Sequence, residues 1–168
     1  APFPTLAVVD GPAYGAGGGL AVACDLCWAT ERATFRFPEV RLGLAPAVLS
    51  PFVLRAVGRR AMIELFATGA AVSAQRAMEM GIVSKVFPEI VALDAHLEVF
   101  REEFLGTAPG AVAYVKRMPN EMRPLSPLSE QRTIAMKHLR ERRISEEAAE
   151  GLAAFREMRE PRWKGAGG

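Results

Sequence analysis

A glycine-rich turn is the part of this chain whose residue types and spacing best suit chemistry. Four of the five residues from Gly15 to Gly19 are glycine, and they join an apolar run at residues 5–9 to a helix-like run at residues 20–24. Glycine permits positive φ and the close approach of a ligand, and the first turn of a helix exposes N–H groups with a partial positive charge. The turn is therefore predicted to bind an anion, or a carbonyl oxygen that becomes negative during a reaction. Close packing of the strand against the helix is the alternative explanation, but it requires fewer glycines.

Two classes of ligand fit such a turn. A dinucleotide-binding domain needs the pattern G-x-G-x-x-G between a strand and a helix. Gly15 and Gly17 supply the first two glycines, but Leu20 occupies the third glycine position, and no clear strand–helix–strand unit is expected to follow. A carbonyl oxygen needs only the backbone N–H groups at the start of the helix. The oxyanion site is therefore favoured over the nucleotide-binding domain.

Length and composition exclude several other classes of function. The 168 residues, half of them hydrophobic, are enough for one domain with a real core. A net charge of +2 gives no reason to expect a nucleic acid or an anionic membrane as partner, and no apolar run approaches the roughly 20 residues of a membrane span. Cys24 and Cys27 have no further ligands near them, so we expect reduced, mostly buried thiols, no metal, and a cytoplasmic or organellar matrix location.

The elements that must position the turn can be predicted from apolar patterns and from turn residues. The expected strands are residues 5–9, 26–29, 34–37 and 82–86. The expected helices are residues 16–24, 48–57, 59–67, 74–80, 91–105 and 110–118, a long one from Ser126 or Ser129 to about Arg143, and a last one that begins at Ser145. The pattern predicts an α/β part over residues 1–88 and a helical part over residues 89–168.

Four segments, taken in order, resemble segments of one known family. They are residues 8–25 (VVDGPAYGAGGGLAVACD), 35–46 (FRFPEVRLGLAP), 73–87 (SAQRAMEMGIVSKVF) and 150–163 (EGLAAFREMREPRW). Together they make essentially the whole chain similar to the crotonase, or enoyl-CoA hydratase/isomerase, superfamily. The resemblance implies a crotonase-like β/α spiral core followed by a C-terminal helical trimerisation region, in a homotrimer or a dimer of trimers. Members of this family are longer ahead of the position of residue 1, so a further N-terminal segment that carries the first oxyanion donor is also implied.

The same resemblance implies roles for particular residues. Glu39 follows Pro38 at a position where the family carries a catalytic glutamate, although the residues alone favour a solvated glutamate in an irregular loop. The backbone N–H of Ala16 falls where the family donates to the thioester oxygen, and Gly17 is its neighbour. Hydratases of the family use a second glutamate, and Gly19 stands at its position in this chain.

One carboxylate limits the chemistry that can be expected. Moving a C=C bond needs only one placed base, whereas water addition with Glu39 alone would need another group to hold the water. Asp25 lies too far along the helix and is expected to be structural. The resemblance thus implies an acyl-CoA enzyme of fatty acid metabolism, either an enoyl-CoA hydratase (a lyase) or an isomerase, with coenzyme A as part of the thioester substrate and no permanent cofactor. The alternative is a crotonase-fold protein that has lost catalysis together with its first glutamate.

The helical part offers candidates for phosphate binding and for subunit contacts. Basic residues that could meet CoA phosphates are Lys137, Arg140, Arg142 and Arg143, although a solvated face is the preferred interpretation. His96 and His138 are isolated in the sequence and are expected at the surface without partners. Apolar residues that could make subunit contacts are Leu128, Ile134, Ala135, Leu139, Leu152 and Phe155.

Overall fold

The computed structural model describes residues 1–122 and 127–165, which form two compact units. The core unit is Thr5–Leu97, and the helical unit joins Ala1–Pro4 to Glu98–Gly168. Strands lie in the core unit, and the described part of the helical unit contains helices and their connections. The predicted order, with an α/β core first and helices after it, is confirmed.

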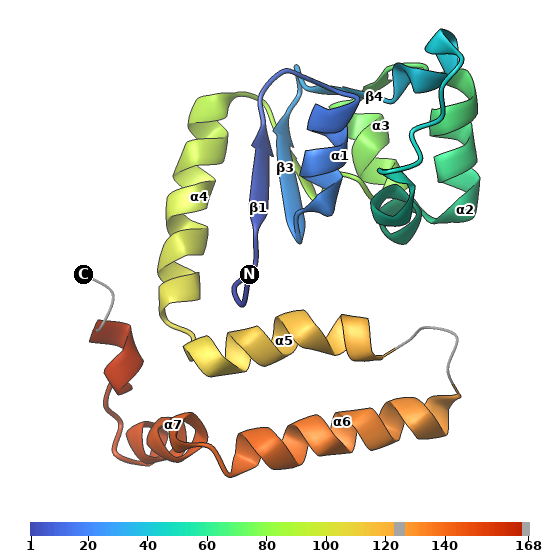
Figure 1. The fold of residues 1–168 in the computed structure, drawn as a ribbon. Coiled ribbons are helices and arrows are strands. Elements are labelled where there is room, and N and C mark those ends of the chain that lie inside the picture. Colours follow the sequence, from blue (N-terminus) through green and yellow to red (C-terminus); the bar gives the residue numbers. More distant parts are fainter. Residues whose placement is uncertain (123–126, 166–168) are drawn as a thin grey trace. The chain divides into compact units, whose positions relative to one another are not determined.

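Two small sheets form the scaffold of the core unit (Figure 1). The first has the order β1-β3-β6 and is parallel throughout, with β1 (Leu6–Val9), β3 (Leu26–Thr30) and β6 (Lys85–Phe87). In the second, β4 pairs in parallel with β2 and antiparallel with β5, these strands being β2 (Pro12–Tyr14), β4 (Thr34–Arg36) and β5 (Val72–Ser73). Parallel neighbours need a crossover, and α1 (Ala16–Ala23) lies in the connection between β1 and β3. The expectation that no strand–helix–strand unit follows the turn is therefore wrong.

Aromatic side chains fill the centre of the core unit. Phe35 and Phe37 are both fully buried, as their alternation in the sequence predicts, and Trp28 of β3 is almost as inaccessible. The ring of Phe37 lies 5.2 Å from that of Phe66, which belongs to the long helix α2 (Ser50–Thr68). Burial of each such side chain stabilises the fold by about 1.5–3 kcal/mol.

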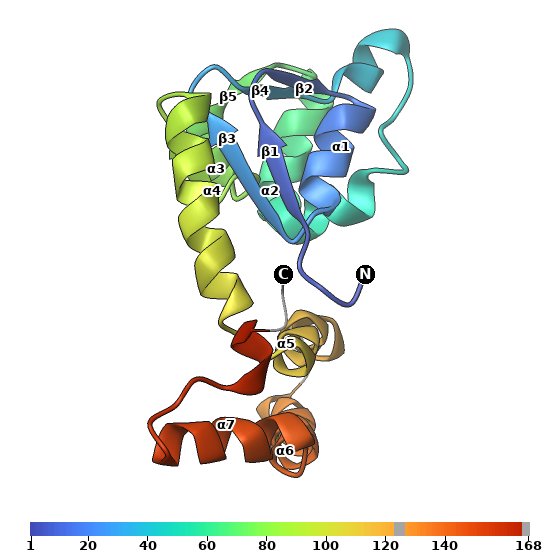
Figure 2. The ribbon, with the colours of Figure 1, turned by 90° about the vertical axis from the view of Figure 1, so that its left-hand side faces the viewer.

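Helices cover the sheets of the core unit, and α1 packs against β1 and α2 (Figure 2). Gly58 has φ 74° and interrupts α2 at the position where the sequence predicts one helix to end and another to begin. The helix α3 (Ala74–Met80) then precedes β6. The predicted strand at residues 82–86 starts too early, because the N–H groups of Ile82 and Val83 donate to the carbonyl of Ala77 and close the end of α3 instead.

Two adjacent glycines of α1 differ in the space around them, which gives a matched prediction of stability. A Cβ on Gly17 would meet nothing within 4 Å, whereas a Cβ on Gly18 would lie 2.9 Å from the carbonyl oxygen of Ala13. We expect Gly17→Ala to raise the free energy of unfolding by up to about 1 kcal/mol through helix propensity, and Gly18→Ala to lower it by about 1–3 kcal/mol through overpacking. Urea denaturation of both variants measures the difference, and equal effects would contradict the packing described.

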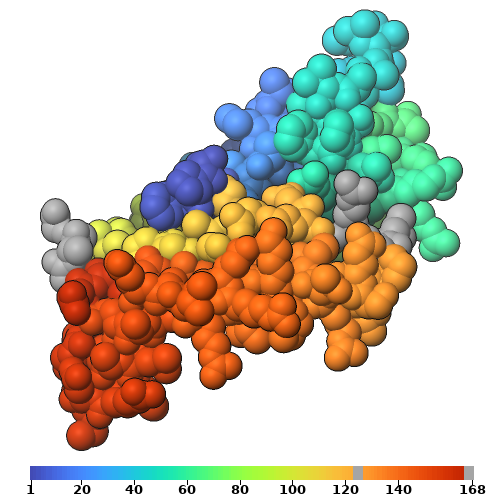
Figure 3. Space-filling model, turned by 60° about the horizontal axis from the view of Figure 1, so that its bottom comes forward, coloured from blue at the N-terminus to red at the C-terminus, as the bar shows by residue number. Residues whose placement is uncertain are grey.

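The helical unit continues from α4 (Ile90–Leu105), which begins in the core unit. Its other helices are α5 (Pro109–Glu121), α6 (Leu128–Arg143) and α7 (Glu146–Arg156), followed by the 3₁₀ helix η2 (Arg162–Gly165). The helices α5 and α6 lie side by side (Figure 3). Ser145 caps α7 as predicted, because its Oγ accepts a hydrogen bond from the N–H of Ala148. The cap of α6 is Pro127 and not Ser129, which lies inside the helix, while Ser126 is outside the described residues.

The two histidines are not isolated surface residues, so that expectation is wrong. His138 of α6 is only 3% exposed, and its Nε2 lies 3.0 Å from Oε2 of Glu121 in α5. His96 of α4 is half-buried, with its ring 5.0 Å from that of Trp28. Both partners come from elements distant in the sequence, and a spacing pattern within one helix cannot reveal them.

The end of the described chain is held against α7 by one carboxylate. Glu150 accepts hydrogen bonds from the Arg159 guanidinium (2.6 Å) and from the Arg162 N–H (3.0 Å). Trp163 lies beside this cluster, where its indole N–H donates to the carbonyl of Gly106 over 3.2 Å. The hydrogen bonds from Arg159, and then that from Arg162, lower the pKa of Glu150 to about 2.

This carboxylate should make the attachment of the Trp163 segment dependent on pH. The pKa is depressed from 4.5, so its contribution to stability is present above about pH 4.5 and is lost as pH falls toward 2. We expect Glu150→Gln to release the segment at neutral pH and so to shift the fluorescence emission of Trp163 to longer wavelength. The emission of Trp163 is obtained by subtracting the spectrum of the corresponding protein that also carries Trp163→Phe. The control is Glu157→Gln, which removes the other carboxylate that pairs with Arg159, on a side chain that is 60% exposed. Identical spectra for Glu150→Gln and the unchanged protein would contradict this role.

Candidate active site

The N-terminal end of α1 presents backbone donors without a side-chain cap. Its N-cap residue is Gly15, whose φ of 51° and ψ of −118° favour glycine, and no side chain in the described part of the chain caps the helix. The N–H groups of Ala16 and Gly17 are among those that an α-helix leaves unpaired, and both residues are exposed. The sequence prediction of a glycine turn that opens a helix is thus confirmed in its geometry.

The second part of the site is Glu39, which lies on a short turn held by backbone hydrogen bonds. It belongs to the 3₁₀ helix η1 (Pro38–Leu42), although the sequence predicted an irregular segment here. The backbone carbonyl of Glu39 accepts the N–H of Leu44 over 3.0 Å, and buried Phe37 anchors the chain just before the helix. The carbonyl of Arg36 also accepts the N–H of Gly15 over 2.8 Å, so β4 holds the glycine turn and the glutamate segment together.

The glutamate lies against the glycine turn. A Cβ placed on Gly15 would be 3.5 Å from Oε1 of Glu39. The other oxygen, Oε2, is buried and has no hydrogen-bond partner among the described residues. A buried carboxylate oxygen without a partner is costly, and such groups in folded proteins call for an explanation such as a catalytic role. The structure thus brings together two of the features that the sequence singled out, the donors of α1 and the carboxylate of Glu39.

The position of Gly19 is closed by an apolar side chain. Gly19 is buried, and a Cβ placed on it would overlap the side chain of Leu49, whose Cδ1 would be 2.9 Å away. Leu49 could not be predicted to lie here, because nothing in its local sequence relates it to the glycine turn. Asp25 has the structural role expected, since its carboxylate accepts hydrogen bonds from the N–H and the hydroxyl of Thr5, both over 2.7 Å.

Other candidate groups do not form a site in the described residues. Cys24 and Cys27 are free thiols, and burial, followed by the nearby Cys24, raises the pKa of Cys27 to about 11. Residues 1–122 and 127–165 contain no cluster of three or more His, Cys, Asp or Glu that could hold a metal. The same ranges include no helix with the length and apolar character that crossing a membrane requires.

Part of the basic set on α6 is engaged in ion pairs. Nη2 of Arg142 lies 2.6 Å from Oε2 of Glu147, and Lys137 lies 3.9 Å from Glu141. Glu147 also accepts the N–H groups of Gly110 and Ala111 at the start of α5. Arg140 and Arg143 are exposed. These ion pairs give Arg142 and Lys137 structural partners within the helical unit.

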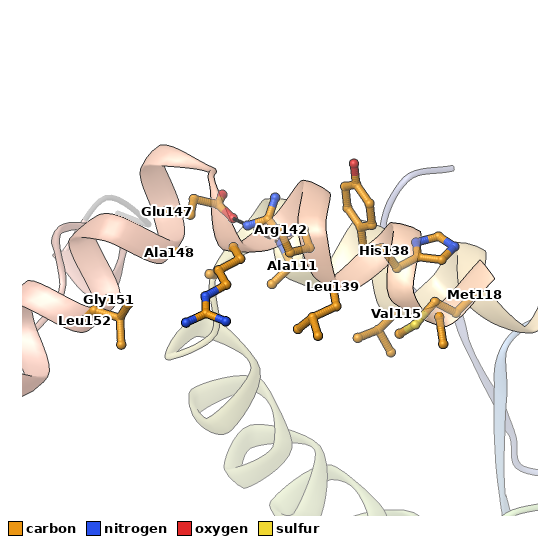
Figure 4. Close-up of a pocket in the computed structure, with 14 residues that line it drawn as sticks. Ala111, Val115, Met118, His138, Leu139, Arg142, Glu147, Ala148, Gly151 and Leu152 are labelled. Carbon is orange, nitrogen blue, oxygen red and sulfur yellow. Dashed lines mark hydrogen bonds and ion pairs between the residues drawn. The ribbon is translucent and has the colours of Figure 1, made fainter. Parts of the chain in front are cut away.

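An apolar groove of about 650 Å³ runs along α5, α6 and α7 within the helical unit (Figure 4). Val115, Leu139 and Leu152 line it and are each more than half exposed. Several polar side chains of its lining are bonded, as in the Arg142–Glu147 pair and the hydrogen bond from Tyr114 to Glu141 (2.9 Å). Two of the three apolar residues, Leu139 and Leu152, belong to the set predicted to make subunit contacts.

Comparison with known proteins gives one consistent result. A family model described as "Enoyl-CoA hydratase/isomerase" matches residues 1–166. A protein of Salmonella agona named "Carnitinyl-CoA dehydratase" is 34% identical over 166 residues. The crystal structure of an enoyl-CoA hydratase from Shewanella pealeana superimposes with a TM-score of 0.89 at 36% identity, and that of an enoyl-CoA hydratase from Mycobacterium smegmatis with a TM-score of 0.86 at 31% identity.

These matches cover almost all of the chain but only part of its relatives. Each includes 96% of the chain, which spans 63% of the Salmonella protein, 60% of the Shewanella structure and 62% of the Mycobacterium structure. The chain therefore spans less than two thirds of the length of these relatives.

Proposed function

Because the chain belongs to the enoyl-CoA hydratase/isomerase family, we propose that the protein acts on an acyl-CoA thioester at the glycine turn. One observation carries this proposal. The uncapped start of α1 lies beside Glu39, whose buried Oε2 has no partner among the described residues. Donors for an oxyanion and a carboxylate for proton transfer are the two groups that the chemistry of a carbon acid next to a thioester requires.

The backbone donors would bind the thioester oxygen. The N–H groups of Ala16 and Gly17 point out of the first turn of α1, where the helix dipole adds a partial positive charge. A thioester oxygen gains negative charge when a proton leaves the adjacent carbon, so these hydrogen bonds strengthen as the reaction proceeds. The proposed role of the two residues is therefore stabilisation of the transition state more than binding of the substrate.

Glu39 would carry the proton. In a 3-enoyl thioester its carboxylate takes a proton from the carbon next to the thioester, and the electron pair of that C–H bond moves toward the thioester oxygen. The pair then returns as a C=C bond at the 2-position, while the electrons of the original double bond take the proton back from Glu39 at the fourth carbon. All atoms and electrons are conserved, and coenzyme A participates only as part of the substrate, without a permanent cofactor.

Hydration is the second candidate reaction. It is favoured by the names of the Salmonella and Shewanella proteins, a dehydratase and a hydratase. Leu49 beside Gly19 favours double-bond migration, because the nearest described atoms there are its apolar carbons and not a carboxylate that could hold a water molecule. Free Cys24 and Cys27 fit a reducing compartment, so we place the protein in the cytoplasm or an organellar matrix.

We also propose that the helical unit joins copies of the protein into a trimer or a dimer of trimers. The supporting observation is the exposed apolar face: Leu128, Leu139, Leu152 and Phe155 are each more than half exposed. Large apolar side chains left exposed in this number are typical of subunit interfaces.

Light scattering at micromolar concentration tests this assembly. We expect the mass of three or six copies, and we expect Leu139→Glu to lower it because the charge would have to be buried in the interface. The control Val91→Glu adds the same charge at a comparably exposed position outside the groove and should leave the mass unchanged. A monomeric unchanged protein would contradict the proposal.

The activity itself can be tested with a panel of thioesters. Binding is measured by calorimetry with a saturated acyl-CoA, and turnover is measured with 2-enoyl-CoA and 3-enoyl-CoA of several chain lengths. The proposal predicts binding together with conversion of at least one enoyl-CoA. Binding without any conversion would support the non-catalytic alternative, and absence of binding would contradict the proposed function.

A further inference from the structure

The side chain of Leu49 occupies the space that a side chain at position 19 would need. All three distal carbon atoms of Leu49 would lie at or below 3.0 Å from a Cβ on Gly19, a separation that forces a shift. Gly19 is buried and Leu49 is half-buried, so the two residues pack against each other where α1 meets the start of α2.

The backbone of Leu49 is fixed at the start of α2. Its N–H donates to the carbonyl of Pro46 over 3.2 Å, and its carbonyl accepts the N–H groups of Phe52 and Val53, both over 3.1 Å. Val53 is fully buried and anchors the first turn of the helix. The first turn of α2 therefore fixes the backbone from which the methyl groups of Leu49 reach α1.

The contact lies on the face of α1 that also carries the start of the oxyanion site. Gly19 comes three residues after Ala16, and residues three apart are neighbours on the surface of a helix. At Gly19 the site therefore has an apolar wall, whereas the carboxylate of Glu39 lies beside Gly15. Apolar methyl groups offer a water molecule no hydrogen bond, so a water there would lose partners that it has in bulk solvent.

From this contact we propose that Leu49 determines the specificity of the reaction, by excluding the water molecule that would otherwise add to the substrate. This inference rests on the proposed function. With water excluded beside Gly19, a bound enoyl thioester exchanges protons with Glu39 and its double bond migrates. With water admitted, the oxygen of water would bond to the third carbon of a 2-enoyl thioester and a proton would bond to the second.

Replacement of Leu49 tests the inference. Two variants are informative: Leu49→Ala opens the space, and Leu49→Asn nearly keeps the volume but offers hydrogen bonds to water. We expect both to raise the ratio of water addition to double-bond migration by at least about tenfold, equivalent to about 1.4 kcal/mol. The control Leu54→Ala removes a leucine of the same helix that is 45% exposed, and it should leave the ratio unchanged.

A pair of variants at position 19 gives a second test. Gly19→Glu alone should destabilise the protein because of its overlap with Leu49, whereas Gly19→Glu combined with Leu49→Ala should fold and add water. An unchanged ratio in both Leu49 variants, with proton exchange retained, would overturn the role of Leu49 and leave the proposed function intact. Absence of proton exchange with the unchanged protein would instead contradict the proposed function.

Discussion

Replacing Glu39 with Gln should lower the rate of the chemical step by roughly 100- to 10,000-fold, the usual contribution of general acid–base catalysis. Glutamine keeps the size of the side chain and its capacity for hydrogen bonds, but it cannot accept the substrate proton. Binding of a saturated acyl-CoA should change little, because Glu39 acts on the carbon skeleton and not on the CoA moiety. Single-turnover kinetics with 3-enoyl-CoA, together with calorimetry, separates the two effects.

The control for this variant is Glu89→Gln, which neutralises an exposed glutamate of the core unit. Its rate should equal that of the unchanged protein. If Glu39→Gln turned over every enoyl-CoA at the original rate, Glu39 would have no catalytic role. The buried Oε2 of Glu39, which has no hydrogen-bond partner among the described residues, would then need another explanation.

Replacing Ala16 with Pro should lower turnover by about 100- to 1,000-fold, the loss typical when one oxyanion donor is removed. Proline deletes the N–H of residue 16 and is tolerated in the first position of a helix, so α1 should still form. The affinity for a saturated acyl-CoA should fall far less than turnover, because the hydrogen bond strengthens only as the oxygen gains charge.

Circular dichroism should confirm that the Ala16→Pro variant is folded. The matched control is Gly11→Ala, a change before the turn whose added Cβ would meet nothing within 4 Å. Equal losses of affinity and turnover in Ala16→Pro would mean that the turn has a purely structural role.

Features of the fold that depend only on residues close together in the sequence could be predicted from the sequence. Gly58 divides α2 and Ser145 caps α7, and both act through the conformation or the hydrogen bonds of their own segment. The start of β6 could not be predicted, because Ile82 and Val83 are apolar like strand residues but bond to the end of α3. Hydrophobicity identifies buried residues, whereas the partner of each backbone N–H is decided by tertiary structure.

The same distinction applies to the candidate site. The glycine turn and Glu39 are visible in the sequence because each has a distinctive local pattern, and the structure brings them within contact distance. The contact of Leu49 with Gly19 and the pair of His138 with Glu121 join residues of different helices. Such contacts leave no periodic signal in one sequence, so the apolar wall of the site and the buried histidine emerged only from the three-dimensional structure.

The most direct test of the central claim is hydrogen exchange at the carbon next to the thioester. The protein and its Glu39→Gln variant are incubated with 3-enoyl-CoA in heavy water, and deuterium at the second and fourth carbons is followed by NMR. The account predicts incorporation by the unchanged protein and a rate at least about 100-fold lower in the variant. Equal incorporation by both proteins, or none by an unchanged protein that binds the thioester, would contradict proton transfer by Glu39.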